Sequence, residues 1–200
     1  MKVKLLIVSI ILLSFTTKKD IEPIGTVKCN GVYIDKYETT ISDYKEFLNF
    51  ISSDAFFSQD YIQNAQLDSS LNIIYSGPHR KEELITPIVG ITTLQANEYC
   101  KWRSEMVTFA VNYPDFVPQC RGKKCDIPPT YTEILEKNKE AKTVIVYRIP
   151  TQEELEITKN RIKKRNKSLK LLTQGPINII ENVGLRCVAE IELNHDINPN

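Results

Sequence analysis

Three helix starts with the same capping pattern set the layout of this chain. Each has a threonine that can accept a hydrogen bond from the helix backbone, an acidic or amide side chain three residues later, and apolar residues at helical spacing beyond. The pairs are Thr40 and Asp43, Thr92 and Gln95, and Thr151 and Glu154. Runs typical of strands lie between them, at residues 32–38, 88–91 and 143–149. Any α+β domain contains capped helices and core strands of this kind.

The first helix has the clearest buried face. Its apolar residues recur at the 3.6-residue period, and they are Ile41, Tyr44, Phe47, Leu48 and Ile51. We therefore expect this face to lie in the core.

Composition favours one domain and argues against a polyanionic partner. The chain has 200 residues, of which 42% are hydrophobic, enough to bury one core without a metal or several disulfides. Its 26 basic and 25 acidic residues nearly cancel, so charge as a whole favours neither nucleic acid nor an anionic membrane surface. We expect no nucleic-acid partner.

The first residues have the pattern of an export signal. Lys2 and Lys4 precede an apolar run at 5–15, and the chain turns polar at Thr16. The run is shorter than the roughly 20 apolar residues of a membrane-spanning helix. We expect a signal peptide at 1–16, a single domain at 17–200 with no transmembrane span after cleavage, and export to the periplasm or cell envelope. An uncleaved anchor is the alternative.

The stretch between the second and third helices, at about 112–142, is predicted to be an irregular insertion. Several prolines surround a short loop between Cys120 and Cys125. Because export leads to an oxidising compartment, we expect a local disulfide between these two cysteines. Soft thiolates also suit Cu(I), so a metal or redox pair is the alternative.

Four blocks, in order along the chain, resemble the formylglycine-generating enzyme family, also called sulfatase-modifying factors. The first block, 32–40, contains Asp35, Glu38 and Thr40, and the second, 87–102, contains Tyr99, Cys100 and Trp102. The third, 147–156, contains Arg148, Pro150, Thr151 and Glu154, and the closing block contains Gly184, Arg186 and Cys187. The resemblance implies structural roles for these residues and a C-type-lectin-like α+β fold with little regular secondary structure. The second block is also similar to that of gliding-motility lipoproteins.

The resemblance implies a disulfide between Cys100 and Cys187, because family members bridge the second helix to the closing strand at these positions. Such a bridge would constrain the unfolded chain by about 4 to 5 kcal/mol in the loop-entropy view. Cys29 is left over, as a buried apolar residue, a free thiol or an intermolecular link.

The chain departs from the family where catalysis is expected. Active members resemble oxidases that hold Cu(I) between two thiolates after the third helix, beside a calcium-binding segment. Residues 159–183 contain no cysteine and no such segment. The iron motif of ergothioneine-type sulfoxide synthases needs several histidines, and the chain has only His79 and His195. We therefore expect no catalytic residue, no metal and no cofactor.

These observations favour an exported, non-catalytic module for binding or assembly in a bacterial cell envelope, with an envelope protein as its partner. Two other functions stay open. One is a copper-dependent oxidase that converts a protein cysteine to formylglycine, with Cys120 and Cys125 as relocated thiols. The other is a lectin-like module that binds a glycan or a peptide.

Overall fold

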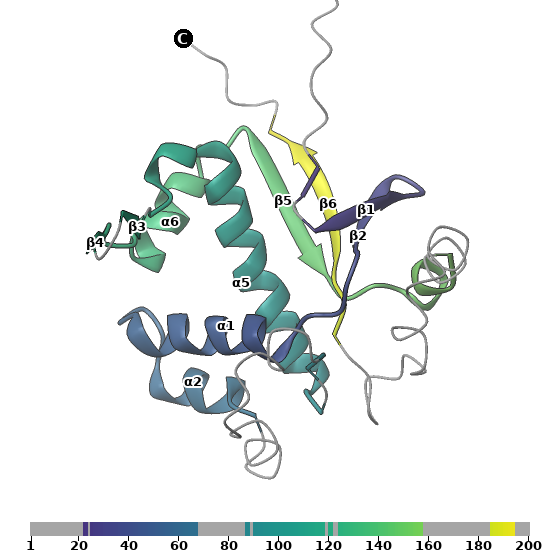
Figure 1. The fold of residues 1–200 in the computed structure, drawn as a ribbon, viewed down its shortest axis with the longest axis horizontal. Helices are drawn as coiled ribbons and strands as arrows, with labels where there is room; N and C mark the ends of the chain where they lie inside the picture. Colours follow the sequence, from purple (N-terminus) through teal and green to yellow (C-terminus); the bar gives the residue numbers. More distant parts are fainter. Residues whose placement is uncertain are drawn as a thin grey trace, which may run out of the picture.

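A computed structural model describes residues 22–23, 25–67, 87–88, 90–118, 120–121, 124–157 and 185–194. Four antiparallel strands in these ranges form one sheet in the order β1-β2-β6-β5. Helix α5 (Thr93–Asn112) packs along β5, and α1 (Ile41–Ser53) and α2 (Gln59–Ala65) pack against α5 and each other (Figure 1). The architecture is α+β, as the sequence predicts.

Strands β1 (Thr26–Cys29) and β2 (Val32–Asp35) form a hairpin that the sequence analysis does not identify. Its two-residue turn is Asn30-Gly31, with φ angles of 47° and 90°. Asn-Gly is the preferred pair for a turn that needs positive φ at both central positions. The signal for this hairpin is therefore present in the sequence.

Strand β6 (Val188–Leu193) completes the sheet from the far end of the chain. It pairs with β2 through Tyr33 and Ala189, and with β5 (Thr143–Arg148) through Tyr147 and the same Ala189. The expected strands at 32–38 and 143–149 are thus confirmed in shortened form, and a strand follows Cys187 directly.

The expected strand at 88–91 is wrong. Pro87 makes an isolated bridge to Thr40, and the described residues of the segment, Ile88, Gly90 and Ile91, belong to no strand. Ile88 and Ile91 are 0% and 6% exposed, so their apolar character reflects core packing of an irregular segment. The Ile88 amide donates to the carbonyl of Thr39, which holds the segment beside the start of α1.

The three predicted capping pairs all begin helices. Thr40 and Asp43 form a reciprocal capping box before α1 (Ile41–Ser53), and Thr92 and Gln95 form one before α5 (Thr93–Asn112). Thr151 and Glu154 exchange the same pair of hydrogen bonds ahead of the helical residues 152–157. The predicted face of α1 is buried at all five positions. A further helix, α2 (Gln59–Ala65), is capped by Ser58.

The prediction that 112–142 is irregular is wrong for a helix that takes up about a quarter of its length. Residues Tyr131–Asn138 form α6, which begins at a fourth capping box made by Thr130 and Glu133. Its Tyr131 and Ile134 are 4% and 0% exposed, so α6 adds to the core. The rest contains a short 3-10 helix, η1 (Pro114–Phe116), and the paired strands β3 (Cys120–Arg121) and β4 (Lys124–Cys125).

Within the described ranges, no helix combines the length and the hydropathy that a membrane span needs.

Helix α5 hydrogen-bonds along the free edge of β5. Ser104 accepts from the Tyr147 amide at 2.7 Å, and Thr108 accepts from the Ile145 amide at 2.9 Å. Asn112 donates to the Thr143 carbonyl at 2.6 Å and accepts from the amides of Lys142 and Thr143.

The spacing of these contacts has a simple geometric basis. Four helix residues rise about 6 Å, close to the roughly 6.7 Å of two strand residues. A side chain at every fourth position of α5 therefore meets every second backbone position of β5. An uncovered edge strand offers its backbone to other chains, and α5 removes that possibility here.

We predict that Asn112→Ala lowers the free energy of unfolding by about 2 to 3 kcal/mol, because it leaves partly buried backbone groups of β5 without partners. Urea denaturation followed by circular dichroism measures the change. Asn97→Ala is the matched control, since Asn97 is exposed on the same helix. Equal denaturation midpoints for the two variants would show that α5 does not support the edge of β5.

Candidate functional site

A hollow of about 610 Å³ lies where β2 leads into α1 and α5 passes alongside. Carboxylates from Asp35, Glu38 and Asp43 line it, together with the guanidinium of Arg103 and the rings of Tyr37 and Tyr99. It therefore combines residues of the first family block with residues of α5. A volume of this size is typical of small-ligand sites.

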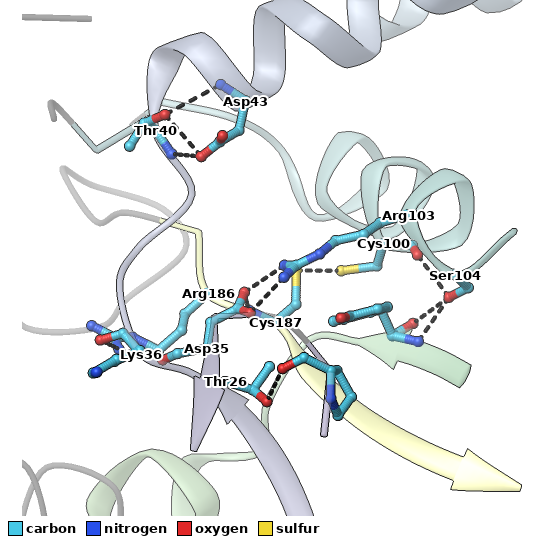
Figure 2. A network of polar contacts seen from close by, with 12 residues as sticks. Thr26, Asp35, Lys36, Thr40, Asp43, Cys100, Arg103, Ser104, Arg186 and Cys187 are labelled. Carbon is cyan, nitrogen blue, oxygen red and sulfur yellow. Dashed lines mark hydrogen bonds and ion pairs between the residues drawn. The ribbon is translucent and has the colours of Figure 1, made fainter. Parts of the chain in front are cut away.

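A buried ion pair forms one wall of the hollow. The Arg103 guanidinium donates to both carboxylate oxygens of Asp35 at 2.6 and 2.7 Å (Figure 2). Asp35 also accepts from the Cys187 amide at 2.9 Å, and its residue is 4% exposed. Two parallel hydrogen bonds between a guanidinium and a carboxylate fix both the distance and the relative orientation of the two groups. Asp35 thus joins β2, α5 and the segment that enters β6.

Arg103 is held as a cation. Its guanidinium carbon lies 4.1 Å from the centre of the Tyr147 ring, a cation–π contact. Burial lowers the pKa of Arg103, but the hydrogen bonds to Asp35 and the negative charge of Asp35, with smaller contributions from Cys187 and Tyr147, together outweigh burial, and the net shift is upward.

Arg186 ties the closing block to the first block. One of its nitrogens donates to the carbonyls of Asp35 and Lys36 at 2.7 and 3.1 Å. The other lies 3.0 Å from one carboxylate oxygen of Glu38. The second carboxylate oxygen of Glu38 is buried and has no hydrogen-bond partner among the described residues, and the same holds for the hydroxyl of Thr39. Unpaired polar atoms therefore lie beside the hollow.

Cys100 and Cys187 meet beneath the ion pair. Their sulfur atoms are 3.0 Å apart, and the residues are 1% and 0% exposed. The structure has both as free thiols, and the hydrogen bond to Cys100, together with burial, raises the pKa of Cys187. Cys29 packs with Ile34 and Val188 in a separate small cluster. The bridge between Cys100 and Cys187 stays a prediction.

The other predicted cysteine pair lies elsewhere. Backbone pairing between β3 and β4 sets Cys120 opposite Cys125, while their side chains are outside what the structure describes. Figure 1 shows this hairpin beside α6, well away from β2. The structure does not bring it to the hollow.

The third family block forms a second polar network. Arg148 on β5 donates to both carboxylate oxygens of Glu154 at 2.8 and 2.6 Å and to Glu190 on β6 at 2.7 Å. The hydrogen bond from Arg148 is the main reason that the pKa of Glu154 falls to about 2. Pro150 and Thr151 lie in the turn that carries this network from β5 into the next helix.

The remaining family-motif residues have varied positions. Trp102 packs against the rings of Phe47, Phe50 and Tyr99 in the core. Gly184 lies outside the described residues, as do the expected signal peptide, His79 and His195.

Arg103 is the site residue that the sequence analysis left without a role. It lies three residues after Cys100 and four after Tyr99, so all three share one face of α5. Tyr99 and Cys100 are among the buried residues of that helix. A charged residue on a buried helix face needs a buried partner, and Asp35 in an otherwise apolar strand was the available carboxylate.

The chain was compared with protein families, curated proteins and solved structures. The family model described as sulfatase-modifying factor enzyme 1-like domain matches residues 12–169. This range includes the first three blocks, and the closing block lies beyond it. The searches of curated proteins and of solved structures found no match.

We predict that Arg103→Met lowers the free energy of unfolding by about 3 to 5 kcal/mol, because the Asp35 carboxylate would stay buried without its cation. Thermal and urea unfolding measure the loss. Lys101→Met is the control, since it removes the same charge from an exposed position of α5. A loss no larger than that of the control would mean that Asp35 is solvated in solution.

We also predict that Cys100 and Cys187 are disulfide-bonded in natively exported protein, because their sulfurs need to move by only about 1 Å to reach bonding distance. Peptide mapping without reduction should recover the linked pair. Alkylation of both thiols in the folded, exported protein would contradict the bridge.

Proposed function

This chain belongs to the sulfatase-modifying factor enzyme 1-like family, and we propose that it is a non-catalytic member that acts as a binding or assembly module in a bacterial cell envelope. We also propose that its α+β arrangement is the C-type-lectin-like fold of that family. The proposal includes export through a cleaved signal at 1–16 and recognition of an envelope protein.

The positions and burial of the cysteines are the main support for the non-catalytic proposal. Copper oxidase chemistry needs two thiolates that converge on one metal and face a substrate. Residues 159–183, where the family places that pair, contain no cysteine. Cys29, Cys100 and Cys187 are 0 to 2% exposed and pack in the core, where a substrate thiol cannot reach them.

The hollow beside Asp35 supports a binding role. Much of its polar lining is already committed to the fold, since Asp35 pairs with Arg103, Glu38 with Arg186, and Asp43 caps α1. Groups that are held in place by the fold form a rigid recognition surface, which limits the entropy lost on binding. The same observation favours the second candidate, a lectin-like module for a glycan or peptide.

We expect that the reduced protein, loaded with Cu(I) in the presence of a competing chelator, neither retains one equivalent of copper nor converts a sulfatase-motif peptide to its aldehyde. Copper content and the peptide mass measure the two outcomes. The Cys120→Ser, Cys125→Ser double variant is the control and should behave in the same way. Copper retention and aldehyde formation that both disappear in the double variant would replace the proposal with the oxidase.

Crosslinking on native envelopes tests the positive half of the proposal. Mass spectrometry should recover crosslinks from this chain to an envelope protein. Recovery of only intramolecular crosslinks would argue against an assembly role.

A further inference from the structure

Two oxygens of residues that line the hollow beside Asp35 have no hydrogen-bond donor in the part of the chain that the structure describes. Glu38 is an acceptor-only carboxylate, and Arg186 engages one of its oxygens while the other has no partner. The Thr39 hydroxyl, on a residue that is 4% exposed, is also unpaired. The nearby guanidinium groups of Arg103 and Arg186 are both occupied. The lining therefore has an excess of acceptors over free donors.

Tyr99 adds a hydroxyl to this set. Its ring packs against Tyr44, Phe47 and Trp102 in the core, which leaves the residue 4% exposed. Tyr99 lines the hollow, and its hydroxyl has no hydrogen-bond partner among the described residues. Tyr99 thus shares the lining of the hollow with Asp35, Asp43 and Arg103.

The rim suits a cation as well. Tyr37 lines the hollow and is 55% exposed, so its ring is accessible from solvent. The Lys36 ammonium already lies 5.9 Å from the centre of this ring, within the range of a cation–π contact. Asp43 is exposed at the same rim and carries a second carboxylate.

We propose that this hollow receives a basic side chain, lysine or arginine, from the partner protein. Its ammonium or guanidinium would donate to the Tyr99 hydroxyl and to the carboxylates of Glu38 and Asp43 that line the hollow. The hollow, at about 610 Å³, has room for the side chain and the backbone that carries it. This inference rests on the proposed binding function and adds the chemistry of the group that is recognised.

The test uses three blocked tripeptides, acetyl-Gly-X-Gly-amide, where X is lysine, arginine or norleucine. Each is titrated into the purified, isotope-labelled protein, and amide chemical shifts are followed by NMR. The basic peptides should bind with dissociation constants of about 1 mM, as expected for a single anchoring group. The shifts should concentrate in residues 35–43 and 99–103. Norleucine has similar length and no charge, so it should bind at least about tenfold more weakly.

Variants then assign the contacts. Tyr99→Phe removes one hydroxyl and should weaken binding of the basic peptides about three- to tenfold, and Glu38→Gln should weaken it about tenfold or more. Glu46→Gln is the matched control, because it removes the same charge from an exposed position of α1 outside the hollow. Retained amide dispersion in the Tyr99→Phe spectrum shows that the loss is not one of folding.

Three outcomes would overturn the inference. They are binding of norleucine as tight as that of lysine, equal weakening by Glu38→Gln and Glu46→Gln, and absence of localised shifts at tens of millimolar peptide, roughly tenfold above the expected constant. The copper and crosslinking experiments are independent of these titrations. If crosslinks to an envelope partner are found but the titrations fail, the proposal of a basic side chain in the hollow is rejected and the proposed binding function is kept.

Discussion

The contact between Asp35 and Arg103 is the interaction on which the rest of this structure depends. Asp35 ends β2, Arg103 lies in the middle of α5, and the Cys187 amide that also donates to Asp35 precedes β6. One carboxylate thus fixes three segments that are distant in sequence. Because both charged side chains are largely buried, removing only one of them would greatly lower the free energy of unfolding. The ion pair lies next to the sulfurs of Cys100 and Cys187 in the core and also forms a wall of the hollow. It therefore stabilises both the core and the candidate site.

Local signals predicted the helices well. The capping boxes at Thr40, Thr92 and Thr151 depend only on residues within one turn, so they can be found from the sequence alone. The same pattern at Thr130 was overlooked because the surrounding prolines suggested an irregular loop. Strands were harder, since the run at 88–91 has strand composition and is buried for another reason. Whether such a run is a strand or a buried irregular segment depends on pairing with distant strands, which local composition does not predict.

The candidate site was predicted only in part. The resemblance identified Asp35, Glu38, Tyr99, Cys100, Arg186 and Cys187, and the structure places all of them around one region. The contacts among these residues could not be predicted. Asp35 and Arg103, for example, are 68 residues apart in the sequence, and no local sequence pattern indicates that they pair. The unpaired hydroxyl of Tyr99 is likewise a property of three-dimensional packing: in the sequence it reads only as one more apolar position of α5.

The central place of β6 in the sheet has a consequence for how the chain acquires its structure. β6 lies between β2 and β5, so the hairpin and β5 have no sheet contact with each other until it arrives. A chain that emerges from a ribosome or a translocation channel does so from its N-terminus, and β6 is the last of these strands to appear. Closure of the four-stranded sheet is therefore a late step, because the hairpin and β5 are joined only through β6.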